Sequence, residues 1–323
     1  MRLGEAAVDS VRCGGCGSEF GFVAGVLDLR VGLEGFDTEA DRRLAEQLAA
    51  GTDLDLEGLL RELWRSRPEV PSALAERFVR ADRIGADRAR EVMGQIESLA
   101  GAGAFDGATV LEVGAGTGAL GCVVAPRAGH VVVTDVSAAW LVVARRRLEA
   151  AGATNVDVLA CSAEDLPFAD GTFDLVLAAD VIEHVPAAAP FTSSCHRVLR
   201  PGGRLWLSTP NRLSLTPEPH VRLWGVGFLP HRLAVAYVRR LRGVDYRDIH
   251  TLSAAALRRT LAATGSRVCI VPPVIPAAVR TGYGPLARRL IDLYAVAART
   301  PALRPLLLTV APLFHATVTK QKS

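Results

Sequence analysis

The chain has 323 residues, half of them hydrophobic, with a net charge of only +3, which predicts one large folded domain with additions. The small net charge argues against a dedicated nucleic-acid-binding protein, and no run of about 18 uncharged apolar residues predicts a membrane span. Residues 1–15 lack the apolar stretch of a signal peptide, so we expect a cytoplasmic protein.

The basic residues are nearly all arginine, because the only lysines are Lys320 and Lys322 at the C-terminus. This excludes a P-loop of the GxxxxGK type and a Schiff-base lysine in the middle of the fold. It also excludes the Tyr-x-x-x-Lys pair of short-chain dehydrogenases, a large class of dinucleotide-binding enzymes.

Residues 1–35 contain Cys13-Gly-Gly-Cys16, two of six cysteines that do not form the pattern of a disulfide framework. The segment resembles the second half of a small zinc ribbon. A structural zinc site needs four ligands, and the chain has no second CxxC pair. The favoured interpretation is a degenerate, metal-free remnant; a site shared between two chains and a misassigned start codon stay open.

Residues 36–104 form an Ala-, Leu-, Glu- and Arg-rich region whose apolar spacing predicts two to four helices. Breaks are expected at Gly51, Pro68 and Pro71.

From residue 109 onward, strands and helices alternate, which predicts a parallel, doubly wound α/β sheet. The strands are nearly all apolar, as expected when both faces of a sheet are covered. Ser137 is placed to cap a helix that should stop at Gly152. The predicted strands are 109–113, 130–135, 155–160, 173–179 and 204–210, and the predicted helices are 117–127, 137–151 and 187–199.

After Pro210 the alternation is interrupted twice. An insertion at 211–252 is rich in Arg, His, Pro and aromatic residues, and a second one covers 273–311. A helix at 252–265, a strand at 267–271 and a last strand at 314–320 are expected around them.

The stretch from Leu111 to Gly121 carries a strand directly into a glycine-rich loop, which lets a ligand approach the backbone at the start of a helix. Gly114-x-Gly116-x-x-Ala119 fits a dinucleotide fingerprint. Gly114, Gly116 and Gly118 after Glu112 equally fit an S-adenosylmethionine loop. The loop alone does not decide between the two.

Other polar signals fall at the carboxyl ends of the predicted strands, where ligands bind in open α/β sheets. Asp135 ends the second strand, 21 residues after Gly114, and its carboxylate can accept both hydrogen bonds of a ribose diol. The sequence CSAEDLPFADGTFD leaves the third strand, and Ala179-Asp180 leaves the fourth. LRPGG, residues 199–203, predicts a tight turn before the fifth.

Together LEVGAGTG, VVVTDVS, AEDLPFADGTFDLVLAADVIEHV and LRPGGRLWLSTPN resemble the class I S-adenosylmethionine-dependent methyltransferases, most closely the branch with the ubiquinone-biosynthesis O-methyltransferases. The resemblance covers about 105–210, a third of the chain. It implies a Rossmann-like seven-stranded sheet within 105–323 and S-adenosylmethionine as cofactor. Ser162 departs from the family, which usually has Asp there. The implied cofactor contacts are Glu112, Gly114, Ala115, Gly116, Gly118, Asp135, Val136, Ser162, Ala163, Glu164 and Ala179.

The resemblance implies methyl transfer to a small or lipid-like acceptor, at an oxygen. An RNA methyltransferase with a zinc-ribbon guide and an inert cofactor-binding partner subunit remain alternatives. A dinucleotide oxidoreductase is disfavoured by the missing Tyr/Lys pair and by the AEDLPF and LRPGG motifs. No nucleic-acid partner is expected, and a homodimer and a peripheral membrane contact stay open.

His184, which follows the fourth strand, is the predicted general base. His220 and His231, in the first insertion, are expected to be structural rather than catalytic; His250 is a further candidate. Some relatives carry Glu-x-x-Glu-His at this point and bind a divalent metal. Whether Asp180, Glu183 and His184 do so is left open, and no metal ligand is assigned.

The first insertion is expected to cover the substrate site, with Trp224, Phe228, Tyr237 and Tyr246 available to stack on the acceptor. In the second insertion an apolar stripe shares one helical face. Such a stripe could line the site of a long substrate or form a patch that contacts a membrane surface. The favoured interpretation is that it packs into the hydrophobic core. The stripe consists of Leu286, Leu290, Leu293 and Ala297.

Overall fold

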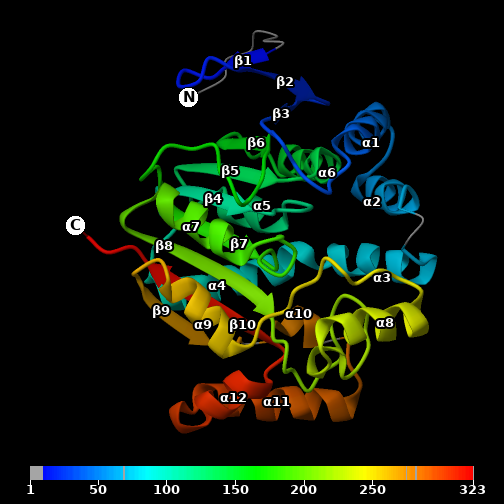
Figure 1. Cartoon of the computed structure of the whole chain (residues 1–323), viewed down its shortest axis with the longest axis vertical. Coiled ribbons are helices and arrows are strands. Elements are labelled where there is room, and N and C mark those ends of the chain that lie inside the picture. Colours follow the sequence, from blue (N-terminus) through cyan, green and yellow to red (C-terminus); the bar gives the residue numbers. More distant parts are fainter. Residues whose placement is uncertain (1–9, 68–69, 274, 281, 323) are drawn as a thin grey trace.

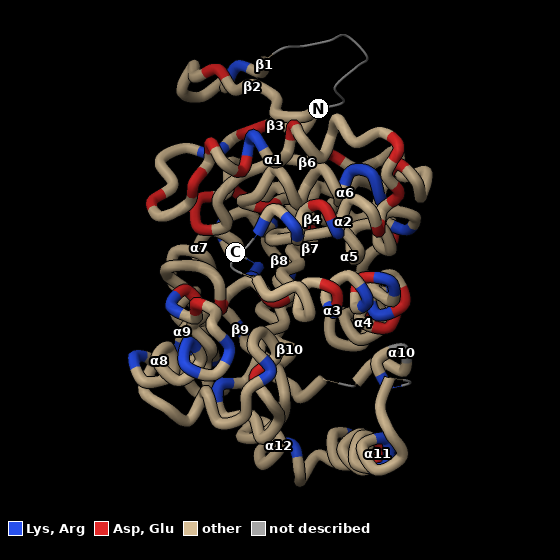
Figure 2. Tube along the Cα trace, turned by 90° about the vertical axis from the view of Figure 1, so that its right-hand side faces the viewer, with Lys and Arg blue, Asp and Glu red and all other residues tan. Residues whose placement is uncertain are grey.

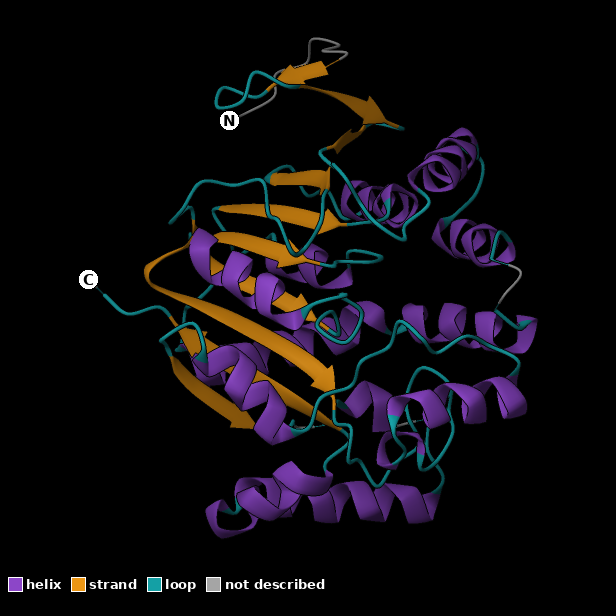
Figure 3. Ribbon diagram, viewed as in Figure 1, coloured by secondary structure: helices purple, strands orange, loops and turns teal. Residues whose placement is uncertain are grey.

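The computed structural model describes residues 10–67, 70–273, 275–280 and 282–322. It has the predicted doubly wound α/β architecture, in which helices cover both faces of a largely parallel sheet (Figure 1, Figure 3). The strand order is β1-β2-β3-β6-β5-β4-β7-β8-β10-β9. The strands are β1 (Ser10–Arg12), β2 (Glu19–Val23), β3 (Val26–Asp28), β4 (Thr109–Val113), β5 (His130–Asp135), β6 (Val156–Ala160), β7 (Phe173–Ala179), β8 (Leu199–Pro210), β9 (Arg267–Val271) and β10 (Leu313–Thr319).

In the described residues, four helices precede the part in which strands and helices alternate, and two to four were predicted. Gly51 caps α1 and Pro71 precedes α3, as predicted, whereas Pro68 lies outside the described residues. The helices are α1 (Thr38–Ala50), α2 (Leu56–Arg65), α3 (Ser72–Arg83), α4 (Gly85–Ala100), α5 (Ala119–Val124), α6 (Ala138–Ala150), α7 (Ala188–Val198), α8 (His231–Arg242), α9 (Ala254–Ala262), α10 (Ala277–Arg280), α11 (Pro285–Arg299) and α12 (Arg304–Val310).

The hydrophobic core lies on both faces of the sheet, because successive strand residues point to opposite sides. In β4, Val110 packs into the cluster formed with α1, α2, α4 and α6, whereas Leu111 packs into the cluster formed with α7 and α9. Both side chains are completely buried. The apolar runs of the central strands therefore reflect burial on two sides.

Among the described residues the sheet has ten strands rather than the seven expected. The N-terminal segment extends it, since β3 pairs in parallel with β6 (Leu27 opposite Leu159) and β2 and β1 follow as an antiparallel ribbon. Val26 and Leu27 are buried there. The extension covers the edge of β6, whose backbone groups would otherwise lack partners.

The predicted turn at LRPGG lies inside β8. Phe173 pairs with Leu199 and the next pair joins Leu175 to Arg204, so the intervening residues bulge out of the ladder. Pro201 has no N–H to donate and Gly202 has φ +81°. The residues that predicted a turn thus produce a bulge within a longer strand.

The two insertions occupy the end of the molecule that holds α8, α11 and α12 (Figure 1). The core interpretation of the second insertion is wrong for its leucines, since Leu286, Leu290 and Leu293 are all exposed. Within the described ranges, no helix combines the length and the apolar character that crossing a bilayer requires.

Candidate active site

The glycine loop after β4 depends on glycine at two positions. Gly114 has φ +65°, and a Cβ there would lie 2.5 Å from Cγ2 of Val181. Gly118, the N-cap of α5, has φ +70°, and a Cβ there would lie 2.8 Å from Cβ of Ala144. Both conformations disfavour other residues, and both sites are closely packed. The loop therefore lies tightly between the segment after β7 and α6.

A cavity of about 310 Å³ lies between this loop and the N-terminal helices. This volume is at the lower end of the range of about 300–1,000 Å³ for small-molecule sites. Trp64 and Trp140 form part of its wall. The structure thus brings together four predicted cofactor residues, which line it: Glu112, Gly114, Ala115 and Ala179.

Glu112 both orders the loop and faces the cavity. Its Oε2 accepts a hydrogen bond from the backbone N–H of Gly121 at 2.8 Å. A Cβ at Gly121 would lie 2.6 Å from the same oxygen, so glycine is required for this contact. Burial raises the pKa of Glu112 to about 8, against its usual 4.5.

Asp135, at the carboxyl end of β5, joins two loops. One carboxylate oxygen accepts from the N–H of Gly116 and the other from the N–H of Ser137, both at 2.9 Å. Burial raises the pKa of Asp135. Ser137 in turn caps α6 by accepting from the N–H of Trp140, as predicted.

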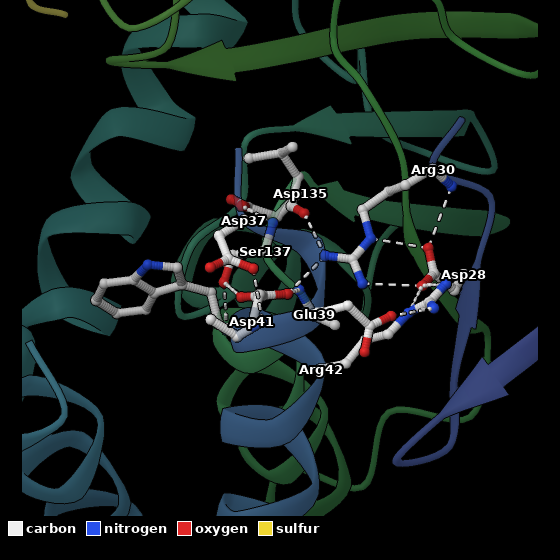
Figure 4. Close-up of polar contacts among 12 residues, drawn as sticks. Asp28, Arg30, Asp37, Glu39, Asp41, Arg42, Asp135 and Ser137 are labelled. Carbon is white, nitrogen blue, oxygen red and sulfur yellow. Dashed lines mark hydrogen bonds and ion pairs between the residues drawn. The ribbon is translucent and has the colours of Figure 1, made fainter. Parts of the chain in front are cut away.

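A buried polar network from the N-terminal segment supports the loop after Asp135 (Figure 4). The guanidinium of Arg30 donates to both oxygens of Asp28, to Asp41 at 2.6 Å and to the carbonyl of Val136 at 3.0 Å. Asp41, on α1, also accepts from the hydroxyl of Ser137 and from the N–H of Ala138 at 2.8 Å.

Arg30 and Asp41 were not predicted as functional residues from the sequence. Their partners lie about 100 positions further along the chain, and nothing in the local sequence distinguishes this arginine or this aspartate from the many others. Only the packing of α1 against α6 brings the groups together.

The loop after β6, predicted to contact the adenine, starts beside Asp135, because the N–H of Cys161 donates to the Asp135 carbonyl at 3.0 Å. The hydroxyl of Ser162 accepts from the N–H of Glu164 at 3.2 Å. The Glu164 carboxylate accepts from the N–H of Ala187 at 2.9 Å, at the start of α7. Ala163 packs on the adjacent core. These contacts hold the loop in place.

The predicted base, His184, faces a second histidine. Nε2 of His184 lies 3.1 Å from Nε2 of His220, and the two rings are nearly perpendicular. Nδ1 of His220 lies 2.5 Å from a carboxylate oxygen of Glu218. The first insertion therefore brings a carboxylate-oriented imidazole to His184, although His220 was expected to be structural.

Two pKa shifts distinguish the histidines. Desolvation and the neighbouring His220 lower the pKa of His184 to about 4, so this ring is neutral near pH 7. Burial lowers the pKa of His220, but the hydrogen bond and charge of Glu218 outweigh it and the net shift is upward. His184 is thus a neutral imidazole beside a more basic one.

Glu183 lies next to His184 and His220. Its Oε2 accepts from the hydroxyl of Thr209 at 2.9 Å, and within the described part of the chain its buried Oε1 has no hydrogen-bond partner. Burial and the charge of Asp180 raise the pKa of Glu183 to about 8. Ligand atoms of Glu183, His184 and His220 all lie within 4.8 Å of one another.

This cluster differs from the Asp180, Glu183 and His184 set considered from the sequence. Asp180 has φ +56° and its carboxylate accepts from the hydroxyl of Ser208 at 2.7 Å, while His220 supplies the third ligand atom of the cluster. A buried carboxylate oxygen without a partner next to two facing imidazole nitrogens fits a divalent cation.

His231 and His250 have structural contacts. Nε2 of His231 lies 3.0 Å from the Arg247 carbonyl, and the N–H of His250 donates to the Glu183 carbonyl at 2.7 Å. The rings of the two histidines pack against each other with centroids 4.8 Å apart.

At the N-terminal cysteines, the thiol of Cys16 donates to the hydroxyl of Ser18 at 3.2 Å, and the N–H of Gly17 donates to the Cys13 carbonyl. Among the described residues, no third His, Cys, Asp or Glu joins Cys13 and Cys16 in a metal-binding cluster.

Part of the chain is similar to known methyltransferases. Residues 111–207 match a family described as "Methyltransferase domain". The chain is 40% identical over 109 residues to the ubiquinone biosynthesis O-methyltransferase of Pseudomonas paraeruginosa, a match that covers 33% of this chain and 46% of that relative. The enzyme of the same name from Rhizobium etli is 38% identical over 108 residues, covering 33% and 43%.

The chain thus spans less than half the length of these curated relatives. A solved structure of an S-adenosylmethionine-dependent methyltransferase from Mesorhizobium loti is similar with a TM-score of 0.48 and 17% identity, over 67% of this chain and 92% of that one. From the domain match, the relatives and the sheet topology, the chain contains a class I S-adenosylmethionine-dependent methyltransferase domain.

Proposed function

We propose that the protein transfers the methyl group of S-adenosylmethionine to an oxygen of a small, lipid-like acceptor. The observation that carries the proposal is the cavity beneath the glycine loop, which Glu112, Gly114, Ala115 and Ala179 line together. The ubiquinone biosynthesis O-methyltransferases among the relatives support an oxygen acceptor, although the match covers less than half of their length.

The loop residues fit this cofactor. A Cβ placed on Gly116 would meet no atom within 4 Å, so the loop faces open space there. Each oxygen of Asp135 accepts one backbone N–H and keeps a lone pair for a ribose hydroxyl. The residues that would hold the cofactor are Glu112, Gly114, Ala115, Gly116, Gly118, Asp135, Val136, Ser162, Ala163, Glu164 and Ala179.

The bound sulfonium supplies a methyl group that is already activated for displacement. The chain's own contribution is mainly to hold the acceptor oxygen in line with it, and well-oriented reactants reach effective molarities of about 10⁵–10⁸ M. Ser162 can bond the adenine amine through its hydroxyl, without the charge assistance of the usual Asp.

His184 accepts the proton of the acceptor hydroxyl in this proposal. The new bond joins the acceptor oxygen to the methyl carbon, and the carbon–sulfur bond breaks. His220, oriented by Glu218 and 3.1 Å from His184, takes the proton onward. A base positioned in this way contributes roughly 10²–10⁴-fold in rate.

The same cluster supports a second candidate role, binding of a divalent cation by Glu183, His184 and His220. The buried Oε1 of Glu183, without a partner in the described ranges, favours this role. A cation there would lower the pKa of a coordinated hydroxyl and replace His184 as the means of activating the acceptor.

Calorimetric titration with S-adenosylmethionine, S-adenosylhomocysteine and NAD, each with and without EDTA, tests the proposal. We expect binding of both adenosyl ligands and none of NAD. Asp135→Ala should abolish this binding, whereas the matched control Asp157→Ala, on the neighbouring strand and paired with His130, should leave it intact. Binding of NAD alone would reject the proposal.

A turnover assay with phenol and catechol acceptors then tests whether His184 takes part in the reaction. His184→Ala should spare cofactor binding and reduce turnover if the residue is the base. Unchanged turnover of that variant removes His184 from the mechanism. Cofactor binding without turnover on any acceptor would favour the inert partner subunit, and turnover on RNA alone would favour the RNA methyltransferase.

A further inference from the structure

The second insertion presents an exposed apolar surface at one end of the molecule. On α11, Leu286 is 74% exposed, Leu293 66% and Val296 66%. On α12, Leu306 is 64% exposed. Of the 14 large apolar side chains exposed in the described part of the chain, seven fall between residues 283 and 306. Such a concentration marks a binding surface rather than ordinary surface composition.

The helix that carries this surface is anchored on its other side. Ala298 of α11 is buried, and the hydroxyl of Tyr294 donates to the Pro273 carbonyl at 2.9 Å. The exposed leucines follow one another at i, i+4 and i+7, from Leu286 to Leu290 and Leu293, so they form one stripe. The contacts of Tyr294 and Ala298 fix α11 against the rest of the protein and leave the stripe exposed to solvent.

The charge of the chain is divided unequally. Residues 211–323 carry 17 Lys and Arg against 4 Asp and Glu, a net charge of +13, whereas residues 1–210 carry 20 against 30, a net charge of −10. The overall value of +3 conceals this division. Figure 2 shows the basic residues around α8 and α9 and the acidic residues mostly in the other half.

Arginines occur on the same two helices as the exposed apolar residues. α11 contains Arg288, Arg289 and Arg299, and α12 begins with Arg304. The single acid of these two helices, Asp292, is paired with Arg280 at 2.7 Å. In the first insertion, α8 has four arginines and no acid.

We propose that the surface formed by α11 and α12 docks on an anionic lipid bilayer. Leucines at the centre of the surface enter the interface between headgroups and acyl chains, and the arginines around them meet lipid phosphates. The helix lies along the membrane and does not cross it, in agreement with the absence of a spanning helix from the described ranges.

Two other occupants fit less well. A second copy of the chain on a two-fold axis would bring the same arginines of both copies together. Single-stranded RNA would need bases to stack on aromatic rings, but the stripe is built of leucine.

The docking surface is connected to the candidate active site. The side-chain amide of Asn211 donates to the carbonyls of Thr309 and Ala311, at 3.0 and 2.9 Å, and so ties the end of α12 to the end of β8. Thr209, two residues earlier in β8, donates to Glu183. A docked membrane would therefore lie close to the site of a lipid-like acceptor.

Flotation of the full-length protein with vesicles tests the proposal without measuring turnover, so its result is independent of methyl transfer. Vesicles of phosphatidylcholine alone are compared with vesicles containing about 30% phosphatidylglycerol. We expect binding to the anionic vesicles only, and less of it at high salt.

The double variant Leu290→Glu/Leu293→Glu should reduce the bound fraction about tenfold or more, since two apolar contacts become charged. Arg289→Glu/Arg304→Glu should reduce it by a similar factor. Val31→Glu, at a 73% exposed position in the N-terminal half, is the matched control and should bind as the original protein does.

Circular dichroism establishes that each variant is folded. Equal binding of the leucine variant, or absence of vesicle binding, would overturn the proposal. A dimer seen by sedimentation and lost in the leucine variant, without vesicle binding, would assign the surface to a second copy. RNA binding that the leucine substitutions leave unchanged would assign it to nucleic acid.

Discussion

The Arg30 guanidinium lies 2.6 Å from the Asp41 carboxylate, and both groups bond the segment that follows Asp135. The side chains of both residues are almost fully buried. The cofactor side of the sheet is thus supported by a part of the chain that the methyltransferase match does not include.

Arg30→Met should destabilise the protein by about 3–5 kcal/mol, because it removes the buried cation paired with Asp41 and leaves Asp28 paired with the partly exposed Arg42. Urea unfolding measures the loss. Arg42→Ala, which removes a partly exposed partner of Asp28, is the control and should cost about 1 kcal/mol or less. A small loss for Arg30→Met would mean that Arg30 does not hold the two acids in the fold.

Gly114→Ala and Gly116→Ala should lose stability for different reasons. At Gly114 the new Cβ meets Val181 at 2.5 Å, so we expect a stability loss of about 1–3 kcal/mol beyond that of the positive φ. At Gly116 the Cβ enters open space, so only the backbone cost of about 1–2 kcal/mol remains.

Calorimetry completes this comparison. The folded Gly116→Ala variant should still lose affinity for S-adenosylmethionine, since its methyl group would enter the open space in which the proposal places the cofactor. Full affinity in that variant would place the cofactor elsewhere.

Glu112 should make stability depend on pH. Its pKa is about 8 in the folded protein and near its usual 4.5 in the unfolded chain, so between these values the folded state binds the extra proton. The stability contribution of this group therefore falls as pH rises from about 5 to 8, by up to about 1.4 kcal/mol per pH unit.

The difference between Glu112→Gln and the original protein isolates this effect, because Glu183 titrates with the same sign in both. Urea unfolding at about pH 5.5 and 7.5 should show a gain for Glu112→Gln that grows with pH. Glu149→Gln, at an exposed site, should show no such trend. Parallel curves for Glu112→Gln would contradict the raised pKa.

The cluster of Glu183, His184 and His220 should bind Co²⁺ in the purified protein after treatment with EDTA. We expect one equivalent, detected by its d–d absorption, and a loss of about tenfold or more in affinity for His220→Ala. His231→Ala removes a histidine of the same insertion whose ring nitrogen lies 3.0 Å from the Arg247 carbonyl, and should keep the metal. Equal affinity in both variants would exclude His220 as a ligand.

The central strands could be predicted closely from the sequence. β4, β5, β7 and β9 have the predicted bounds, because each is a short apolar run enclosed by turn residues. β1 and β3 have three residues each, too few for a periodic signal, and β6, the strand through which β3 joins the central sheet, is far along the chain. The strand count therefore could not be obtained from local patterns.

The candidate site residues that belong to a sequence motif could be predicted. Those that the first insertion contributes could not. Gly114, Asp135 and Ala179 follow from their places at strand ends. His220 and Glu218 reach His184 only through the path of the first insertion, which has no regular pattern. The charge division between residues 1–210 and 211–323 was available in the sequence, but the net value concealed it.

The pairing of β3 with β6 sets an order for folding during synthesis. Leu27 emerges from the ribosome about 130 residues before its partner Leu159, an interval on the order of ten seconds at usual rates of translation. Until then β3 can pair with β2 on one side, but its other edge has no partner. A segment made early is thus among the last to be fixed, and a ribosome that pauses between β3 and β6 leaves this edge of β3 exposed.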